Sequence, residues 1–222
     1  MSISLDEAVE LTRTGDVWVF RGRSVPDRAI QLTTNSPVNH VGMAVVLDDM
    51  PPLMWHAELG RSLPDMWTGS HQRGVQLHDL RDAVCVWANR YGQRAWLRQL
   101  DPPADAAMEQ AVLRTVARLD GTPFPSTAQL AWRWARGRVP QVRLPGRRDR
   151  SGGPAPVPVP DRALETAYCA EVVAVTYEAM GLLPAGRRPN WYDPGRFWSG
   201  DDLDLAGQAK LGAEIEVDIP PR

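Results

Sequence analysis

The spacing of apolar residues changes once along the chain, near Pro103, and this change limits the folds open to it. Before that point, short apolar segments are separated by turn residues, as expected for strands joined by hairpins. After it, apolar residues recur at helical spacing, at Ala107, Ala111, Val112, Thr115, Val116 and Leu119. Strands first and helices later predict an α+β fold rather than a parallel βαβ fold.

The expected elements follow from these patterns. We predict strands at 17–20, 40–47, 53–58, 75–80, 84–88, 94–100 and 214–219. Helices are expected at 5–14, over about 16 residues after Pro103 that end near Asp120, at 127–137, and from the cap at Thr166 to about Met180. Segments 40–47 and 53–58 flank a short turn that contains Pro51 and Pro52, so they are expected to form an antiparallel hairpin.

The composition changes sharply in the second half of the chain. Residues 133–150 hold seven arginines and one aspartate, and residues 140–160 hold six prolines. Such a segment favours a surface loop over a packed element. We therefore predict a single domain over 1–222 with a flexible Arg/Pro-rich insertion at 138–160.

Charge and cysteine content exclude several classes of protein. A net charge of −2 provides no general attraction to nucleic acid, and Lys210 is the only lysine, which argues against a lysine nucleophile. Two cysteines do not form a disulfide scaffold. Cys85 lies in the apolar segment 84–88 and is expected to be a buried residue on a strand. No apolar segment approaches the ~20 residues that span a bilayer, and no signal peptide is visible, so the expected location is cytoplasmic.

Cys169 is the main candidate for chemistry. It is expected in the first turn of a helix, with Thr166 placed to cap that helix. Free backbone N–H groups and the helix dipole favour an anion there, and the thiolate is the nucleophilic form of cysteine. The structural alternative is a small residue on a buried helix face, because Val172, Val173 and Thr176 share its side.

Histidines supply the candidate bases. His40 begins the segment 40–47, and a strand-end histidine taken alone is more often a structural residue than a base. His56 and Glu58 share one face of their strand because side chains alternate with period two, and either could orient His40.

Metal and serine chemistry have weaker support. The histidines His40, His56, His71 and His78 could supply metal ligands together with Cys169 or Asp79. However, no two of these histidines fall at helical i,i+3 or i,i+4 spacing, and there is no CxxC pair, so no metal and no cofactor are expected. A GxSxG turn is absent as well.

Three ordered groups of residues carry a resemblance. Residues 15–22 (GDVWVFRG), 30–36 (IQLTTNS) and 40–43 (HVGM) resemble the opening of the circularly permuted NlpC/P60 papain-like family. This group includes the YiiX/YaeF-like proteins and, more distantly, the lecithin:retinol acyltransferase family. Residues 119–124 (LDGTPF) and 168–173 (YCAEVV) are similar to the family's later motifs. The resemblance covers roughly 12–60, 115–130 and 165–220.

The resemblance implies a permuted papain-like fold, in which an antiparallel, barrel-like meander packs against helices and the cysteine helix comes late. It also implies that Cys169 is the nucleophile, His40 the base and His56 the third polar residue, in a place where close relatives often carry glutamate. Glu58 is the alternative third residue. The 133–160 segment matches nothing known from the family.

The implied activity is a cysteine-dependent amidase or peptidase that forms an acyl-thioester. The alternatives are a lipid-directed acyltransferase or thioesterase and a binding module without turnover. The expected substrate is a small-molecule, peptide or lipid acyl compound. Nucleic acid is not an expected partner, a membrane surface has little support, and the sequence does not indicate an oligomeric state.

Overall fold

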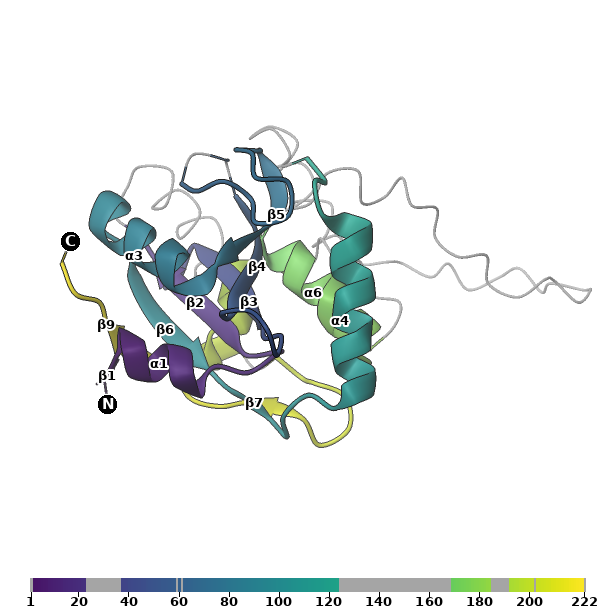
Figure 1. The fold of residues 1–222 in the computed structure, drawn as a ribbon. Coiled ribbons are helices and arrows are strands. Elements are labelled where there is room, and N and C mark those ends of the chain that lie inside the picture. Colours follow the sequence, from purple (N-terminus) through teal and green to yellow (C-terminus); the bar gives the residue numbers. More distant parts are fainter. Residues whose placement is uncertain are drawn as a thin grey trace, which may run out of the picture.

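The computed structural model describes residues 2–22, 37–58, 60, 62–123, 169–184, 192–201 and 203–221 (Figure 1). The strands are β1 (Ser2–Ser4), β2 (Val17–Arg21), β3 (His40–Val45), β4 (Leu53–Glu58), β5 (Gly74–Asp79), β6 (Arg94–Arg98), β7 (Leu100–Asp101), β8 (Lys210–Leu211) and β9 (Ile215–Asp218). The helices are α1 (Leu5–Leu11), α3 (Leu80–Tyr91), α4 (Ala106–Leu119) and α6 (Cys169–Ala179), with 3₁₀ turns η3 (Pro194–Phe197) and η4 (Ser199–Asp201).

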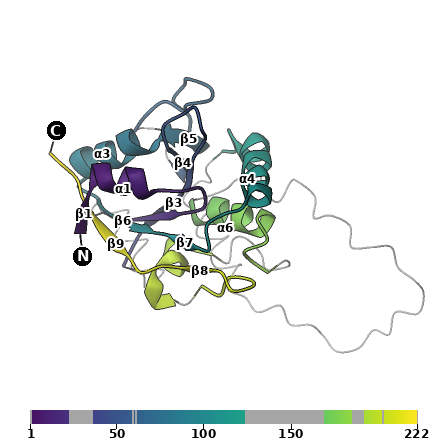
Figure 2. The ribbon, with the colours of Figure 1, turned by 60° about the horizontal axis from the view of Figure 1, so that its bottom comes forward.

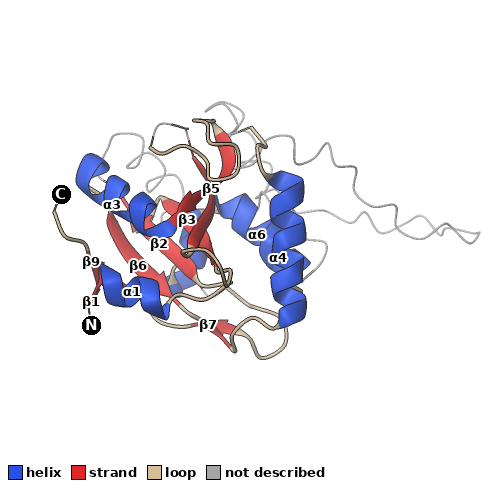
Figure 3. Ribbon diagram, in the orientation of Figure 1, coloured by secondary structure: helices blue, strands red, loops and turns tan. Residues whose placement is uncertain are grey.

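A seven-stranded sheet in the order β1-β9-β6-β2-β3-β4-β5 forms the centre of the molecule. Its pairs are antiparallel except β1 with β9, which brings the two ends of the chain side by side (Figures 1 and 3). The predicted α+β class is confirmed. The predicted hairpin is also confirmed, as β3 and β4, with Met43 opposite Trp55.

Helices cover both faces of this sheet, and each face has its own core (Figure 2). Helices α1 and α3 pack on one face, against Trp18, Phe20, Ala44 and Met54. Helices α4 and α6 pack on the other, where the strands contribute residues such as Val41, Met43, Trp55 and Leu77. In β3 and β4 the odd-numbered residues therefore point to α6 and the even-numbered residues to α3.

Tertiary hydrogen bonds anchor α6 to the sheet. The indole Nε1 of Trp55 donates to Thr176 Oγ1 over 3.1 Å, and Tyr177 Oη donates to the carbonyl of Gly15 over 2.5 Å. Both pairs are buried and join residues more than a hundred positions apart, so they fix how the late helix lies on the early strands.

One prediction of local structure is wrong. Residues 84–88, including Cys85, belong to helix α3 and not to a strand. Asp79 caps this helix by accepting from the backbone N–H of Asp82 over 2.8 Å, and Gly92 ends it with φ +65°. Leu80, Ala83, Val84 and Trp87 form a buried face at helical spacing, which the short apolar segment taken alone does not reveal.

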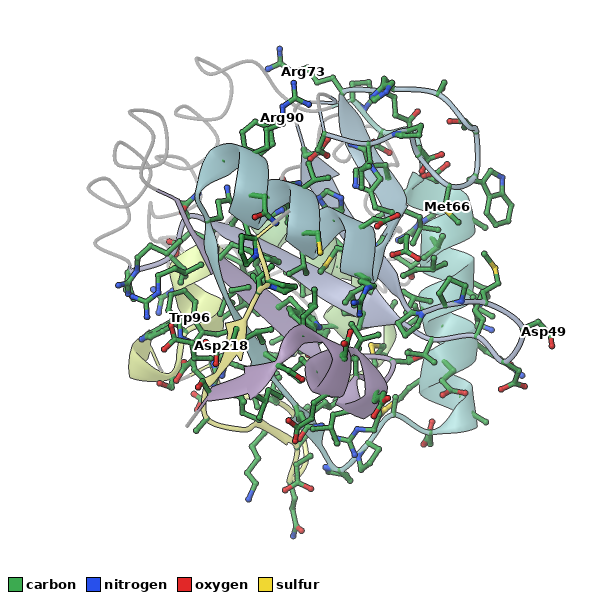
Figure 4. All side chains as sticks on the ribbon, turned by 60° about the vertical axis from the view of Figure 1, so that its left-hand side comes forward. Asp49, Met66, Arg73, Arg90, Trp96 and Asp218 are labelled. Atoms are coloured by element: carbon green, nitrogen blue, oxygen red, sulfur yellow. The ribbon has the colours of Figure 1, made fainter. Side chains whose placement is uncertain are left out.

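The remaining predicted elements are observed where the structure describes them, within a few residues at their ends. The helix at 127–137, the insertion at 138–160 and the cap at Thr166 lie outside the described residues. No helix in the described ranges combines the length and the apolar character needed to cross a bilayer. The turn between β3 and β4 projects from the sheet, with Asp49 at its tip (Figure 4).

Candidate functional site

Cys169 begins the described part of α6, in agreement with its predicted place in the first turn of a helix, and its side chain is buried, with 6% exposed. It belongs to the core on the α6 face of the sheet. The ladder between β3 and β4 runs from Val45 to Met43 and stops before Val41. The backbone N–H of Val41 faces the sulfur of Cys169. The thiol therefore meets β3 at Val41, the residue that follows His40.

The thiol is protonated in this environment. Burial raises the pKa of the Cys169 thiol to about 11, and the carboxylate of Asp193 adds to the rise. The backbone N–H groups of Val41, Ala170 and Cys169 itself lower the pKa but do not outweigh burial. The helix start thus supplies the expected donors, although the net result is a neutral thiol rather than a thiolate.

His40 is the first residue of β3, also as predicted, but its ring lies on the α3 face. Its ring centroid is 5.0 Å from that of Trp87, 5.3 Å from that of His56 and 5.7 Å from that of Phe20. Burial, together with the neighbouring His78, lowers the pKa of His40 to about 4. The imidazole is therefore neutral at physiological pH.

The structure brings Cys169 to the backbone beside His40 and places the two side chains toward different faces of the sheet. Among the described residues, Nε2 of His40 is buried without a hydrogen-bond partner. No hydrogen bond between Cys169 Sγ and an imidazole nitrogen occurs in the described part of the chain. The catalytic role of the pair remains a prediction.

His56 lies next to His40 on the same face, in β4, and is fully buried. Its Nε2 is 3.1 Å from Nδ1 of His78, which lies diagonally across on β5. Burial lowers the pKa of His56 well below its usual value, and the nearby His78 and His40 reinforce this. The contact of His56 with His40 is an edge-to-face ring contact at 88°.

Glu58 takes a separate position at the end of β4. Its carboxylate accepts from the hydroxyl of Ser62 over 2.7 and 2.6 Å and from the indole of Trp87 over 3.2 Å. It therefore lies beside His56 and His78, and its hydrogen bonds hold it at this end of the cluster rather than against His40.

The other candidate metal ligands lie away from His40 and His56. His71 is exposed, and Asp79 caps α3. Arg73 precedes β5 and Arg90 lies in the last turn of α3, and Figure 4 shows both at one end of the molecule.

Sequence reasoning missed three residues at the site. Trp87 covers His40 and His56, and it was missed because its segment was assigned to a strand. Asp193 raises the pKa of Cys169 and also caps η3, a role that its position before Pro194 suggests. Gln76 contacts His78, which alternation along 75–80 could have indicated, since both lie on one face.

A comparison with protein-family models and with curated protein sequences finds no match. Among solved structures, the chain is similar to the crystal structure described as metalloprotein YiiX from Escherichia coli O157:H7, DUF1105. The superposition has a TM-score of 0.55 and covers 94% of this chain and 99% of YiiX.

The fold is YiiX-like. At 17% sequence identity, the likeness to YiiX concerns the fold alone. It agrees with the YiiX-like part of the resemblance in the sequence. The permuted papain-like details and any relation to the acyltransferase family remain predictions.

Proposed function

We propose that the chain is a cysteine-dependent amidase or peptidase in which Cys169 is the nucleophile and His40 the base. One observation carries the proposal: in a YiiX-like fold, the thiol at the start of α6 meets the backbone of Val41, the residue after His40. A distant part of the sequence thus returns to the strand that bears the imidazole. His56 would position His40 through their ring contact.

The implied chemistry is acyl transfer with a balanced proton path. The thiol proton passes to Nε2 of His40 while the sulfur attacks the substrate carbonyl, and the N–H groups at the helix start stabilise the oxyanion. His40 then donates that proton to the leaving amine, and a thioester remains on Cys169. Water, deprotonated by His40, hydrolyses the thioester and restores the thiol.

The resting side chains are not poised for this step. A thiol with a pKa of about 11 and an imidazole with a pKa of about 4 exchange a proton at a cost of about 10 kcal/mol, at about 1.4 kcal/mol per unit of difference. The proposal therefore includes a movement: when substrate binds, the His40 ring leaves Trp87 and approaches the sulfur. This movement is larger than the tightening of a long hydrogen bond that catalytic pairs undergo in a substrate complex, because the two side chains start toward different faces of the sheet.

The test is a comparison of wild type with Cys169→Ala against a library of acyl-amides and acyl-thioesters, with Cys85→Ala as the matched control. We expect turnover of an amide by wild type and Cys85→Ala, none by Cys169→Ala, and an acyl adduct on Cys169 by intact mass. His40→Gln should form the adduct slowly or not at all.

The other outcomes separate the alternatives. Turnover of thioesters only, or acyl transfer to an added alcohol or amine, would indicate a thioesterase or acyltransferase at the same thiol. Equal turnover by wild type and Cys169→Ala would overturn Cys169 as the nucleophile and assign the reaction to another group. No turnover and no adduct with any substrate would overturn the enzyme proposal and leave a binding module.

A further inference from the structure

Three side chains on the α3 face offer metal-ligand atoms to one point. Nε2 of His56, Nδ1 of His78 and a carboxylate oxygen of Glu58 all lie within 4.8 Å of one another. His56 and Glu58 share one face of β4, and His78 stands diagonally from His56 on β5, because Met54 is opposite His78 and Gln76 is opposite His56. Strand alternation therefore brings the three together.

The nitrogen geometry fits a shared metal ion. Nε2 of His56 and Nδ1 of His78 face each other at 3.1 Å. Two nitrogens bound to one tetrahedral zinc at about 2.0–2.1 Å lie about 3.3 Å apart. The two imidazoles thus already have nearly the separation that a common ion requires.

Hydrogen bonds around His78 direct its lone pair to the same point. Nε2 of Gln76 donates to the carbonyl of Gly74 over 3.3 Å, which turns the amide oxygen of Gln76 toward His78. That oxygen can only accept, so Nε2 of His78, 3.2 Å away, carries the proton. Nδ1 of His78 is then unprotonated, as a ligand nitrogen must be. An amide or carbonyl behind the second ring nitrogen is typical of histidines that bind metal.

His56 can adapt to an ion in the same way. Without metal, Nε2–H of His56 donates to Nδ1 of His78, and Nδ1 of His56 is buried with no partner among the described residues. If an ion binds to both facing nitrogens, off the line that joins them, the proton of His56 moves from Nε2 to Nδ1 of its ring. The ring stays neutral, and both facing nitrogens offer lone pairs.

From these contacts we propose that His56, His78 and Glu58 form a site for a divalent transition metal, with zinc as the best fit. Two histidines, one carboxylate and an open fourth position are a donor set that zinc uses in catalytic sites. Ser62 and Trp87 hold the carboxylate by hydrogen bonds, as outer residues do around metal ligands. Glu58 is the least buried of the three, so the ion would enter from its side.

The expectation of no metal rested on helical spacing, which does not apply to ligands on strands. His56 belongs to both proposals, but Cys169 lies in the core on the other face of the sheet. Adducts on Cys169 test the nucleophile, and ion binding tests the metal site. The two proposals can therefore fail separately.

The test is a titration of chelator-treated full-length protein with Co²⁺, followed by visible absorption, and with Zn²⁺ in competition with a chromophoric chelator. We expect one ion per chain and the absorption of tetrahedral Co²⁺. His78→Gln and Glu58→Gln should weaken Zn²⁺ binding by at least about 10–100-fold, the loss that even outer residues cause. His71→Gln, which alters an exposed histidine, and Cys169→Ala should bind like wild type.

A measurement on the wild-type protein keeps the proposal testable if the ligand variants misfold. Zn²⁺ should shift the NMR ring signals of His56 and His78 and leave those of His71 unchanged. The proposal is wrong if wild type binds neither ion at micromolar concentration, if both ligand variants bind like wild type, or if the shifted signals belong to His71. In these cases the two buried histidines form only an N–H···N hydrogen bond.

Discussion

At the scale of single residues, burial decides the chemical state of the candidate site. The N–H groups at the start of α6 favour a thiolate on Cys169, but removal from water outweighs them. The same cause keeps His40 and His56 neutral. A neutral thiol is the less nucleophilic form of cysteine.

The first prediction concerns the reactivity of this thiol. In a Cys85→Ala background, alkylation of Cys169 by iodoacetamide should be slow at pH 7 and rise about tenfold per pH unit toward its pKa of about 11, because only the thiolate reacts. Intact mass at timed intervals measures the rate. A plateau already below pH 8 would contradict this and indicate that His40 pairs with the sulfur in the free protein.

Protonation of Cys169 also predicts a change in stability at high pH. Its folded pKa of about 11 exceeds the unfolded value of about 9, so the unfolded chain loses its proton first. The free energy of unfolding should fall between pH 9 and 11 relative to Cys169→Ala, by up to about 3 kcal/mol. Urea denaturation of both proteins at pH 8 and pH 10.5 measures the difference. The prediction is wrong if the free energy of unfolding changes by the same amount in both proteins between these pH values.

A third residue-scale prediction concerns Gly42, between His40 and Ala44 on β3. A Cβ at Gly42 would lie 2.4 Å from Met54 Sδ and 3.4 Å from His56 Cβ, both in the closed core on the α3 face. Gly42→Ala should therefore destabilise the fold by about 1–3 kcal/mol and displace His56. Gly200→Ala, whose Cβ would be 3.7 Å from Trp198, is the control and should cost little. Urea denaturation and histidine NMR signals check both variants.

At the scale of elements, helix α3 matters more than its sequence pattern indicates. It carries Trp87, which packs on His40 and His56 and donates to Glu58. Helix α3 thereby covers His40 and His56 on its face of the sheet. Helix α4 packs on the other face and has no described contact with these histidines.

The two helix caps allow a matched comparison. Asp79 caps α3 and Asp105 caps α4, each by accepting a backbone N–H over 2.8 Å. Alanine at either position should lower the free energy of unfolding by about 1 kcal/mol. Only Asp79→Ala should also change the NMR signals of His40 and His56, since only α3 covers them. Equal changes in both variants would contradict this division between the two faces.

At the scale of the whole molecule, the C-terminal segment is tied to the sheet by one buried cation. Arg98 on β6 donates to the carbonyls of Phe197, Leu211 and Gly212 over 2.5, 3.1 and 2.7 Å and lies 3.6 Å from the Glu214 carboxylate. Burial lowers its pKa, but the group stays charged. These bonds close the connection between η3 and β9.

Arg98→Met should therefore destabilise the fold by about 3–5 kcal/mol, because it leaves three carbonyls without this donor and removes the cation beside the Glu214 carboxylate. Arg94→Met, which removes the exposed ion pair with Glu216, should cost at most about 1 kcal/mol. Thermal and urea denaturation compare the two. Similar losses in both variants would show that the arginine at 98 does not join the segments.

Much of the fold could be predicted from local pattern. The hairpin of 40–47 with 53–58 and the helical spacing that ends near Asp120 are local signals, and both predictions were correct. The strand assigned to 84–88 failed because five apolar residues fit either period, and only the cap at Asp79 and the turn at Gly92 distinguish them. At the site, the helix start at Cys169 and the strand start at His40 were predictable, since caps and apolar runs are local signals.

The sequence by itself determined the class of fold, the order of its elements and the residues that could carry chemistry. Tertiary structure alone decided which face of the sheet each of them occupies. Because side chains alternate along a strand, the pairing and packing of β3 and β4 sent His40, His56 and Glu58 to α3, while Cys169 arrived on the side of Val41. That choice depends on contacts between residues far apart in the chain, which no local pattern contains.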